Sequence, residues 1–199
     1  PSTSLEIQDG LTTTGAVLTL STKEPSVVAN DVLGQINFQA PLDTGADSDL
    51  VGASIQALAT ATFSDTVNAT DLILKTGASE TATEKMRITS DGDVGIGLDD
   101  PAGKLHVKTT GVNYAALFET TDDSSSAAPD VALYRNSATP ANGDDLGHLI
   151  WRGVETDGAG SPTLTRGNYA DIFCEAQVVT TNSESGKMHL RTKKAGSMN

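Results

Sequence analysis

The stretch RITSDGDVGIGLDDPAGKLHV, residues 87–107, decides the fold of this chain, because glycine and aspartate at this density favour turns over regular helix. Asp91 and Gly92 form a D-G turn between MRIT and DVGIG. A second turn, at Pro101 and Gly103, precedes the short apolar run KLHV. The pattern predicts short strands connected by tight turns.

Four residues at the centre of this stretch alternate between apolar side chains and bare backbone. Val94 and Ile96 point to one side of a short strand, whereas Gly95 and Gly97 leave the other side without a β-carbon. Another backbone, such as that of a neighbouring subunit, can therefore approach closely. We predict that Val94, Gly95, Ile96 and Gly97 form a structural joint that packs near an assembly axis.

A phosphate loop and a calcium loop are the chemical alternatives for the same stretch. Its glycines lack Walker spacing, and no Lys-Ser or Lys-Thr pair follows them. Asp91, Asp93, Asp99 and Asp100 could supply oxygen ligands to calcium, but the spacing and terminal glutamate of an EF-hand are missing. Solvated aspartates in turns are far commoner. We therefore expect neither a metal ion nor a cofactor.

The composition of the 199-residue chain indicates β-structure around a thin core. Hydrophobic residues make up 37% and aromatic residues 4%, which is little apolar material for a protein of this length. A core shared between subunits would compensate. The net charge of −13 disfavours binding to nucleic acid or to anionic membrane surfaces. The sequence also lacks an apolar run long enough to span a bilayer.

The second half of the chain repeats features of the first half. NDVLGQINF, which contains Gly34, returns as GDDLGHLIW, which contains Gly147, at an offset of 113 residues. Farther along the chain, Ile55 corresponds to Ile172 at an offset of 117 residues. The change in offset places a small length difference in the loop between matched strands. A period of this size indicates duplicated domains and not a solenoid.

Apolar residues alternate within each half at the period-two spacing of half-buried strands. In the second half, Ile172 and Cys174 belong to such a stripe. We predict an all-β fold of two similar small antiparallel β-domains, residues 1–86 and 113–199. A Gly-rich β-hairpin connector at residues 87–112 is predicted to join them.

EKMRITSDGDVGIGLDDPAGKLHV, residues 84–107, resembles a segment that recurs in bacteriophage tail-fibre and related virion proteins, often upstream of a self-cleaving intramolecular chaperone domain. Only Leu98 departs from the pattern, where a small polar residue is more usual. The flanking stretches NDVLGQINFQAP and VGASIQALA are similar to phage fibre proteins, including many from marine cyanobacterial hosts. The resemblance implies a virion fibre, built as a parallel homotrimer that contacts other virion proteins.

Side chains with catalytic or metal-binding chemistry are scattered along the chain. His106, His148 and His189 fall in separate predicted strands and lack the i, i+4 pairing of a helical zinc site. Cys174 with one of the last two histidines could form a nucleophile and base. Its place in an apolar stripe favours the alternative, a small buried hydrophobe.

The acidic pairs and two aromatic residues are the candidates for carbohydrate chemistry. Asp144 and Asp145 are adjacent in a strand and point to opposite faces, so they cannot flank a glycosidic bond. Trp151 and Tyr169 could contact a sugar if they are exposed. Trp151 aligns with Phe38, however, which predicts a core position.

The preferred hypothesis is a non-enzymatic structural component of a tail fibre or capsid fibre, located in the virion and contributing to host attachment. One alternative is a host-receptor or glycan-binding module that uses the loop at residues 154–168 to bind a host surface glycan. A polysaccharide depolymerase is the third hypothesis. It requires a pair of suitably spaced carboxylates, which the sequence does not show.

Overall fold

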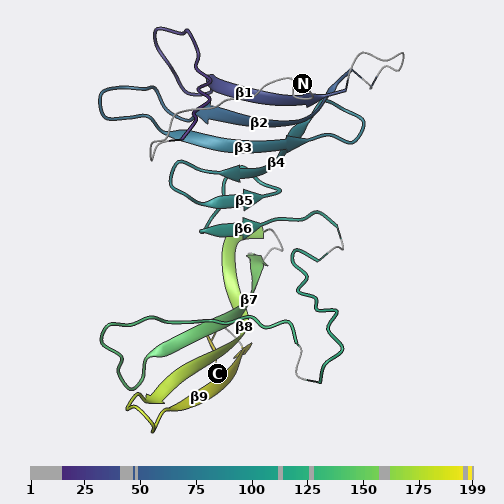
Figure 1. Cartoon of the computed structure of the whole chain (residues 1–199). Coiled ribbons are helices and arrows are strands. Elements are labelled where there is room, and N and C mark those ends of the chain that lie inside the picture. The colour runs from purple at the N-terminus through teal and green to yellow at the C-terminus, as the bar shows by residue number, and fades with distance from the viewer. Residues whose placement is uncertain are drawn as a thin grey trace. The chain divides into compact units, whose positions relative to one another are not determined.

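The chain forms two compact units, Pro1–Leu117 and Phe118–Asn199. The computed structural model describes residues 15–40, 47, 49–111, 114–125, 128–156, 162–194 and 197–198. Every regular element among these residues is a β-strand (Figure 1), so the all-β prediction is confirmed. The described part of the chain contains no helix that could cross a membrane.

The first unit contains a six-stranded sheet whose strands lie side by side in chain order (Figure 1). Its strands are β1 (Val32–Gln39), β2 (Val51–Ala59), β3 (Thr70–Thr76), β4 (Thr83–Ile88), β5 (Val94–Ile96) and β6 (Leu105–Val107). Consecutive strands from β1 to β5 pair antiparallel, but β6 pairs parallel with β5. The pairing of β1 to β4 agrees with the predicted antiparallel domain at residues 1–86, whereas the parallel pair lies in the connector predicted as a hairpin at residues 87–112 and makes the sheet mixed.

The parallel pair arises from the loop at residues 97–104, which carries the chain back so that β6 runs in the same direction as β5. Gly97 opens the loop with a φ of +76°, a left-handed conformation that favours glycine. The backbone N–H of Val94 donates to the carbonyl of Lys104, and that of Lys108 donates to the carbonyl of Ile96, both at 2.9 Å. The predicted connector hairpin therefore continues the first sheet and is not a separate element.

The second unit contains an antiparallel meander. Its strands are β7 (Asp145–Thr156), β8 (Pro162–Val178), β9 (Ser185–Lys194) and the short β10 (Ser197–Met198). The predicted recognition loop at residues 154–168 belongs largely to strands, because Val154 pairs with Arg166 and Thr156 pairs with Pro162. Residues 157–161 lie outside the described part of the chain.

Corresponding hydrogen bonds precede the first strand of each sheet. The carboxylates of Asp31 and Asp144 each accept a bond from the backbone N–H three residues earlier, at 2.6 and 2.9 Å. Asn30 and Gly143, directly before these aspartates, have φ values of 77° and 88°. Their N–H groups donate to the second strand of their own sheet, at 2.8 and 2.7 Å. Each turn therefore ties the start of the first strand to the second strand.

Candidate functional site

One face of the first sheet carries an apolar side chain on every strand. The pairing register aligns these side chains opposite one another, in a single row that crosses the whole sheet. This apolar row consists of Ile36, Ile55, Leu74, Met86, Ile96 and Val107. Ile96, one of the predicted joint residues, is therefore part of a much larger surface.

The apolar row is open to solvent in the single chain. Ile36, Ile55, Leu74 and Ile96 are between 36% and 41% exposed. In β3 the side chains on the face of the apolar row, Leu72 and Leu74, are exposed. The side chains on the opposite face, Asp71 and Ile73, are buried. A contiguous exposed apolar surface of this kind marks an interaction site.

The opposite face of the first sheet holds a network of ion pairs between β3 and β4. Asp71 is 4% exposed and accepts hydrogen bonds from Arg87 Nη1 at 2.7 Å and from the N–H of Ser90 at 2.8 Å. Arg87 also donates from Nε and Nη2 to the two carboxylate oxygens of Glu84. These bonds, first to Glu84 and then to Asp71, raise the pKa of Arg87. The charged side chains on this polar face therefore pair with one another, whereas the side chains of the apolar row stay partly exposed.

The second sheet also has an open apolar face. Three cross-strand rows form it: Gly147, Cys174 and Met188; Leu149, Ile172 and Leu190; and Trp151, Ala170 and Thr192. Leu149 and Trp151 are each 52% exposed, and Leu190 is 71% exposed. Trp151, which was predicted to be in the core, therefore lies half-exposed beside an open groove of about 350 Å³. The apolar alternation correctly identified this face, but in the single chain Leu149, Trp151 and Leu190 remain exposed.

The other face of the second sheet carries a stack of three rings, one from each of β7, β8 and β9. Phe173 lies between His148 and His189, with ring centroids 4.8 and 4.2 Å away. The guanidinium of Arg191 lies 4.3 Å from the centroid of the Phe173 ring, a cation–π contact. The sequence placed the two histidines in separate strands, as observed. The sequence could not predict that these two histidines meet at Phe173, because that depends on the register between the strands.

Asp171 and Arg191 form a bidentate ion pair next to this ring stack. Arg191 donates from Nε to Oδ1 at 2.9 Å and from Nη2 to Oδ2 at 2.7 Å. These bonds lower the pKa of Asp171, and the charges of Arg191 and the two stacked histidines add to the effect. The ionised carboxylate is therefore the form that the folded unit favours.

The ion pair predicts how stability depends on pH. Because the folded state lowers the pKa of Asp171, the ion pair stabilises the fold at pH values above the ordinary pKa of aspartate. This stabilisation is lost as the pH falls through the lower pKa of the folded state. We expect the parent protein to melt at a higher temperature than Asp171→Asn near neutral pH, and this gap to narrow below about pH 4. Thermal unfolding across pH tests this, and a gap that does not change with pH would contradict it.

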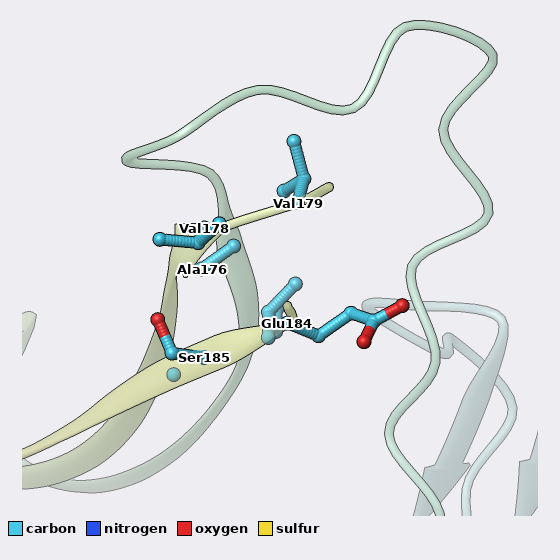
Figure 2. A pocket seen from close by; sticks show the side chains of 7 residues that line it. Ala176, Val178, Val179, Glu184 and Ser185 are labelled. Carbon is cyan, nitrogen blue, oxygen red and sulfur yellow. The ribbon is translucent and has the colours of Figure 1, made fainter. Parts of the chain in front are cut away.

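A second apolar groove, of about 380 Å³, lies where β8 ends and β9 begins (Figure 2). Figure 2 shows Ala176, Val178 and Val179 close together, with the carboxylate of Glu184 directed away from them. Leu146, Ser185 and Gly186 complete the lining. Since no set of polar groups converges in it, the groove suits an apolar side chain better than a sugar or a charged substrate.

The predicted joint residues lie in β5 and directly after it. A β-carbon added at Gly95 would lie 2.6 Å from the carbonyl oxygen of Leu98, and one added at Gly97 would overlap the carbonyl oxygen of Lys108. Both glycines therefore sit where a backbone passes closely, but that backbone belongs to the same chain. The role of Val94, Gly95, Ile96 and Gly97 in assembly stays a prediction.

Two of the aspartates considered as calcium ligands, Asp91 and Asp93, contact a lysine instead. Lys104 Nζ forms an ion pair with Asp93 Oδ1 and donates a hydrogen bond to the carbonyl of Asp91 at 2.9 Å. In the described ranges, no group of three or more histidine, cysteine, aspartate or glutamate residues is placed to hold a metal ion. The calcium alternative therefore receives no support from these residues.

Cys174 lies on the opposite face of the second sheet from the two stacked histidines. Cys174 pairs with Gly147 and Met188, whereas its neighbour Phe173 pairs with both histidines. Adjacent residues in a strand point to opposite faces. A histidine on the far side of the sheet cannot act as a base for this thiol, so the structure does not assemble the considered cysteine–histidine pair.

The acidic pair Asp144–Asp145 has a structural setting. Asp144 caps the turn before β7 and lies 3.2 Å from the guanidinium of Arg135. The Asp145 carboxylate lies 3.5 Å from His148 Nε2. The two carboxylates thus bind different partners. These contacts do not place them on either side of a glycosidic bond, as a glycosidase requires.

No protein-family model and no curated protein matches the chain. The solved structures that resemble it include two at 14% sequence identity. One is the carboxy-terminal domain of the bacteriophage T5 L-shaped tail fibre, with a TM-score of 0.69 over 98% of this chain and 84% of that chain. The other is that domain with its intra-molecular chaperone domain, with a TM-score of 0.72 over 99% of this chain and 58% of that chain. The chain thus has the fold of a phage tail-fibre carboxy-terminal domain.

Proposed function

We propose that the chain is a non-enzymatic structural component of a phage tail fibre, or of a similar fibre-like appendage of the virion. The observation that carries this proposal is the fold shared with the T5 tail-fibre domain along 98% of the chain. A shared fold does not by itself define a function. The resemblance of residues 84–107 to a recurrent segment of virion fibre proteins supports the same conclusion independently.

Self-association as a parallel homotrimer is the second part of the proposal, and the two open apolar faces support it. Complete burial of one isoleucine or leucine side chain contributes about 1.5–3 kcal/mol. Covering the exposed fractions of Ile36, Ile55, Leu74 and Ile96 would therefore contribute about 2–5 kcal/mol per chain. Three chains around one axis can cover one another's apolar faces and leave the polar faces outward.

We also propose that the two units derive from one duplicated β-module. In both sheets the first three strands form an antiparallel meander, β1 to β3 in one and β7 to β9 in the other. The glycine near the start of the first strand pairs with a small residue of the second strand in each case, Gly34 with Ala57 and Gly147 with Cys174. We expect residues 16–80 and 129–197 to superpose as one topology.

Localisation in the virion is tested by a density map of the whole phage particle in which the chain is traced. The chain is expected in a slender appendage, in contact with other virion proteins. Density for the chain in a globular enzyme, or its absence from the particle, would contradict the proposal. A glycan array tests host attachment separately. Binding that disappears when residues 154–168 are replaced would favour the receptor-binding alternative over a plain spacer.

Cys174 provides a built-in probe of the proposed interface, because it is the one cysteine of the chain and lies on the apolar face of the second sheet. If a second copy covers that face, the thiol reacts with a maleimide only when the interface opens. We expect labelling to be roughly tenfold slower, or more, than in Leu190→Ser, which weakens the same face. Equal labelling rates in the two proteins would contradict burial of this face.

A further inference from the structure

Each sheet is preceded by an extended segment without a backbone partner in the described ranges. We call residues 16–22 and 129–135 the leading segments; they correspond at the offset of 113 residues. Neither belongs to a strand, and no backbone–backbone hydrogen bond within the described part of the chain involves them. Both have strand-like alternation, with Leu18 and Leu20 in one and Val131 and Leu133 in the other. All four side chains are exposed.

At Leu20 and at Leu133, each leading segment lies over the apolar face of its sheet and not beside the sheet edge. A β-carbon added at Gly34 would lie 2.7 Å from Cβ of Leu20, and one added at Gly147 would lie 2.8 Å from Cβ of Leu133. Gly34 and Gly147 project toward the apolar faces, because they share strand parity with Ile36 and Leu149. Glycine is needed at both positions for the segment to come this close.

This position creates a hydrogen-bonding requirement once the apolar faces are covered. A segment stacked on a face cannot pair with the strand beneath it, because ladder bonds lie in the plane of the sheet. In a single chain, water can satisfy its N–H and C=O groups. If neighbouring copies exclude that water, each unpaired backbone group costs free energy comparable to a lost hydrogen bond. The segments therefore need partners that a single described chain does not supply.

We infer that each leading segment is an intersubunit strand, whose backbone pairs with a free strand edge of a second copy of this chain. This inference rests on the proposed self-association. The first strand of each sheet offers a suitable edge, since β1 and β7 each end their sheet and have one neighbouring strand. Strand addition of this kind satisfies the backbone of both partners, and the alternating side chains set the register.

Residue-resolved hydrogen exchange on the native protein tests this inference. We expect slow exchange at alternate amides of residues 16–22 and 129–135, because a strand that pairs along one side directs every second N–H to its partner. The amide of Asp65 provides an internal reference for fast exchange, because it lies in an exposed turn and donates no backbone hydrogen bond within the described part of the chain. Fast exchange throughout both segments, in a protein whose solution mass is that of a trimer, would overturn the inference and leave the proposed self-association intact.

A proline substitution gives a second measurement. Thr19→Pro and Leu18→Pro each remove one N–H, and only one of the two adjacent groups can point to a partner strand. We expect one variant to dissociate at a markedly higher protein concentration than the other, and the sensitive variant to be the one whose amide exchanges slowly. Equal effects of the two prolines would contradict pairing along one side. A monomeric parent protein would instead overturn the proposed self-association itself.

Discussion

Replacing Leu74 with aspartate is expected to convert the proposed trimer into folded monomers. Leu74 lies near the middle of the apolar row, between Ile55 and Met86 on the neighbouring strands. In the single chain its side chain is 36% exposed, so the carboxylate can remain hydrated in a monomer. In the proposed trimer the same carboxylate would be buried without a partner, at a cost of several kcal/mol in each subunit. Light scattering should give the mass of one 20.5 kDa chain.

A matched variant separates this effect from the added charge. Thr66→Asp places the same carboxylate on an exposed turn between β2 and β3, so we expect it to leave the proposed trimer intact. Circular dichroism should show that both variants retain the β-structure. If Leu74→Asp stays trimeric at the concentration where the parent is trimeric, the apolar row is not the subunit interface. A monomeric parent would exclude the proposed trimer directly.

Gly97→Ala is expected to destabilise the protein at least twice as much as Gly92→Ala. Both glycines have a φ of +76°, so an alanine at either position adopts the left-handed conformation, which costs about 1–2 kcal/mol. Nothing lies within 4 Å of a β-carbon at Gly92, whereas one at Gly97 overlaps the carbonyl oxygen of Lys108. The added methyl group must therefore displace the backbone next to β6, in addition to straining its own.

Thermal unfolding at one protein concentration measures the difference between these two variants. At about 2–4 °C per kcal/mol for a chain of this length, Gly92→Ala should lower the melting temperature by about 2–8 °C. Gly103→Ala is the neutral control, because its φ is not positive and no atom lies within 4 Å of the added β-carbon. Similar decreases in melting temperature for Gly97→Ala and Gly92→Ala would show that the β5–β6 region adapts to the methyl group.

In the stretch at residues 91–97, some structural features can be predicted from neighbouring residues and others cannot. The turn at Asp91–Gly92, the strand at Val94–Ile96 and the need for glycine at Gly97 all follow from the turn chemistry and alternation of a few neighbouring residues. The identity of the backbone near Gly97 does not follow, because a sequence pattern indicates a close approach without indicating which strand makes it. That strand is β6 of the same chain, which pairs parallel with β5.

The sequence by itself determined the all-β class, the alternation within the strands and the position of the turns, because these depend on the chemistry of adjacent residues. Only the tertiary structure decided which side chains from different strands meet. It aligned six apolar residues in one row, stacked His148 and His189 on Phe173, and left Leu72 exposed beside the buried Asp71. These features depend on cross-strand register and on which face is covered, and both are set by pairing between residues far apart in the chain.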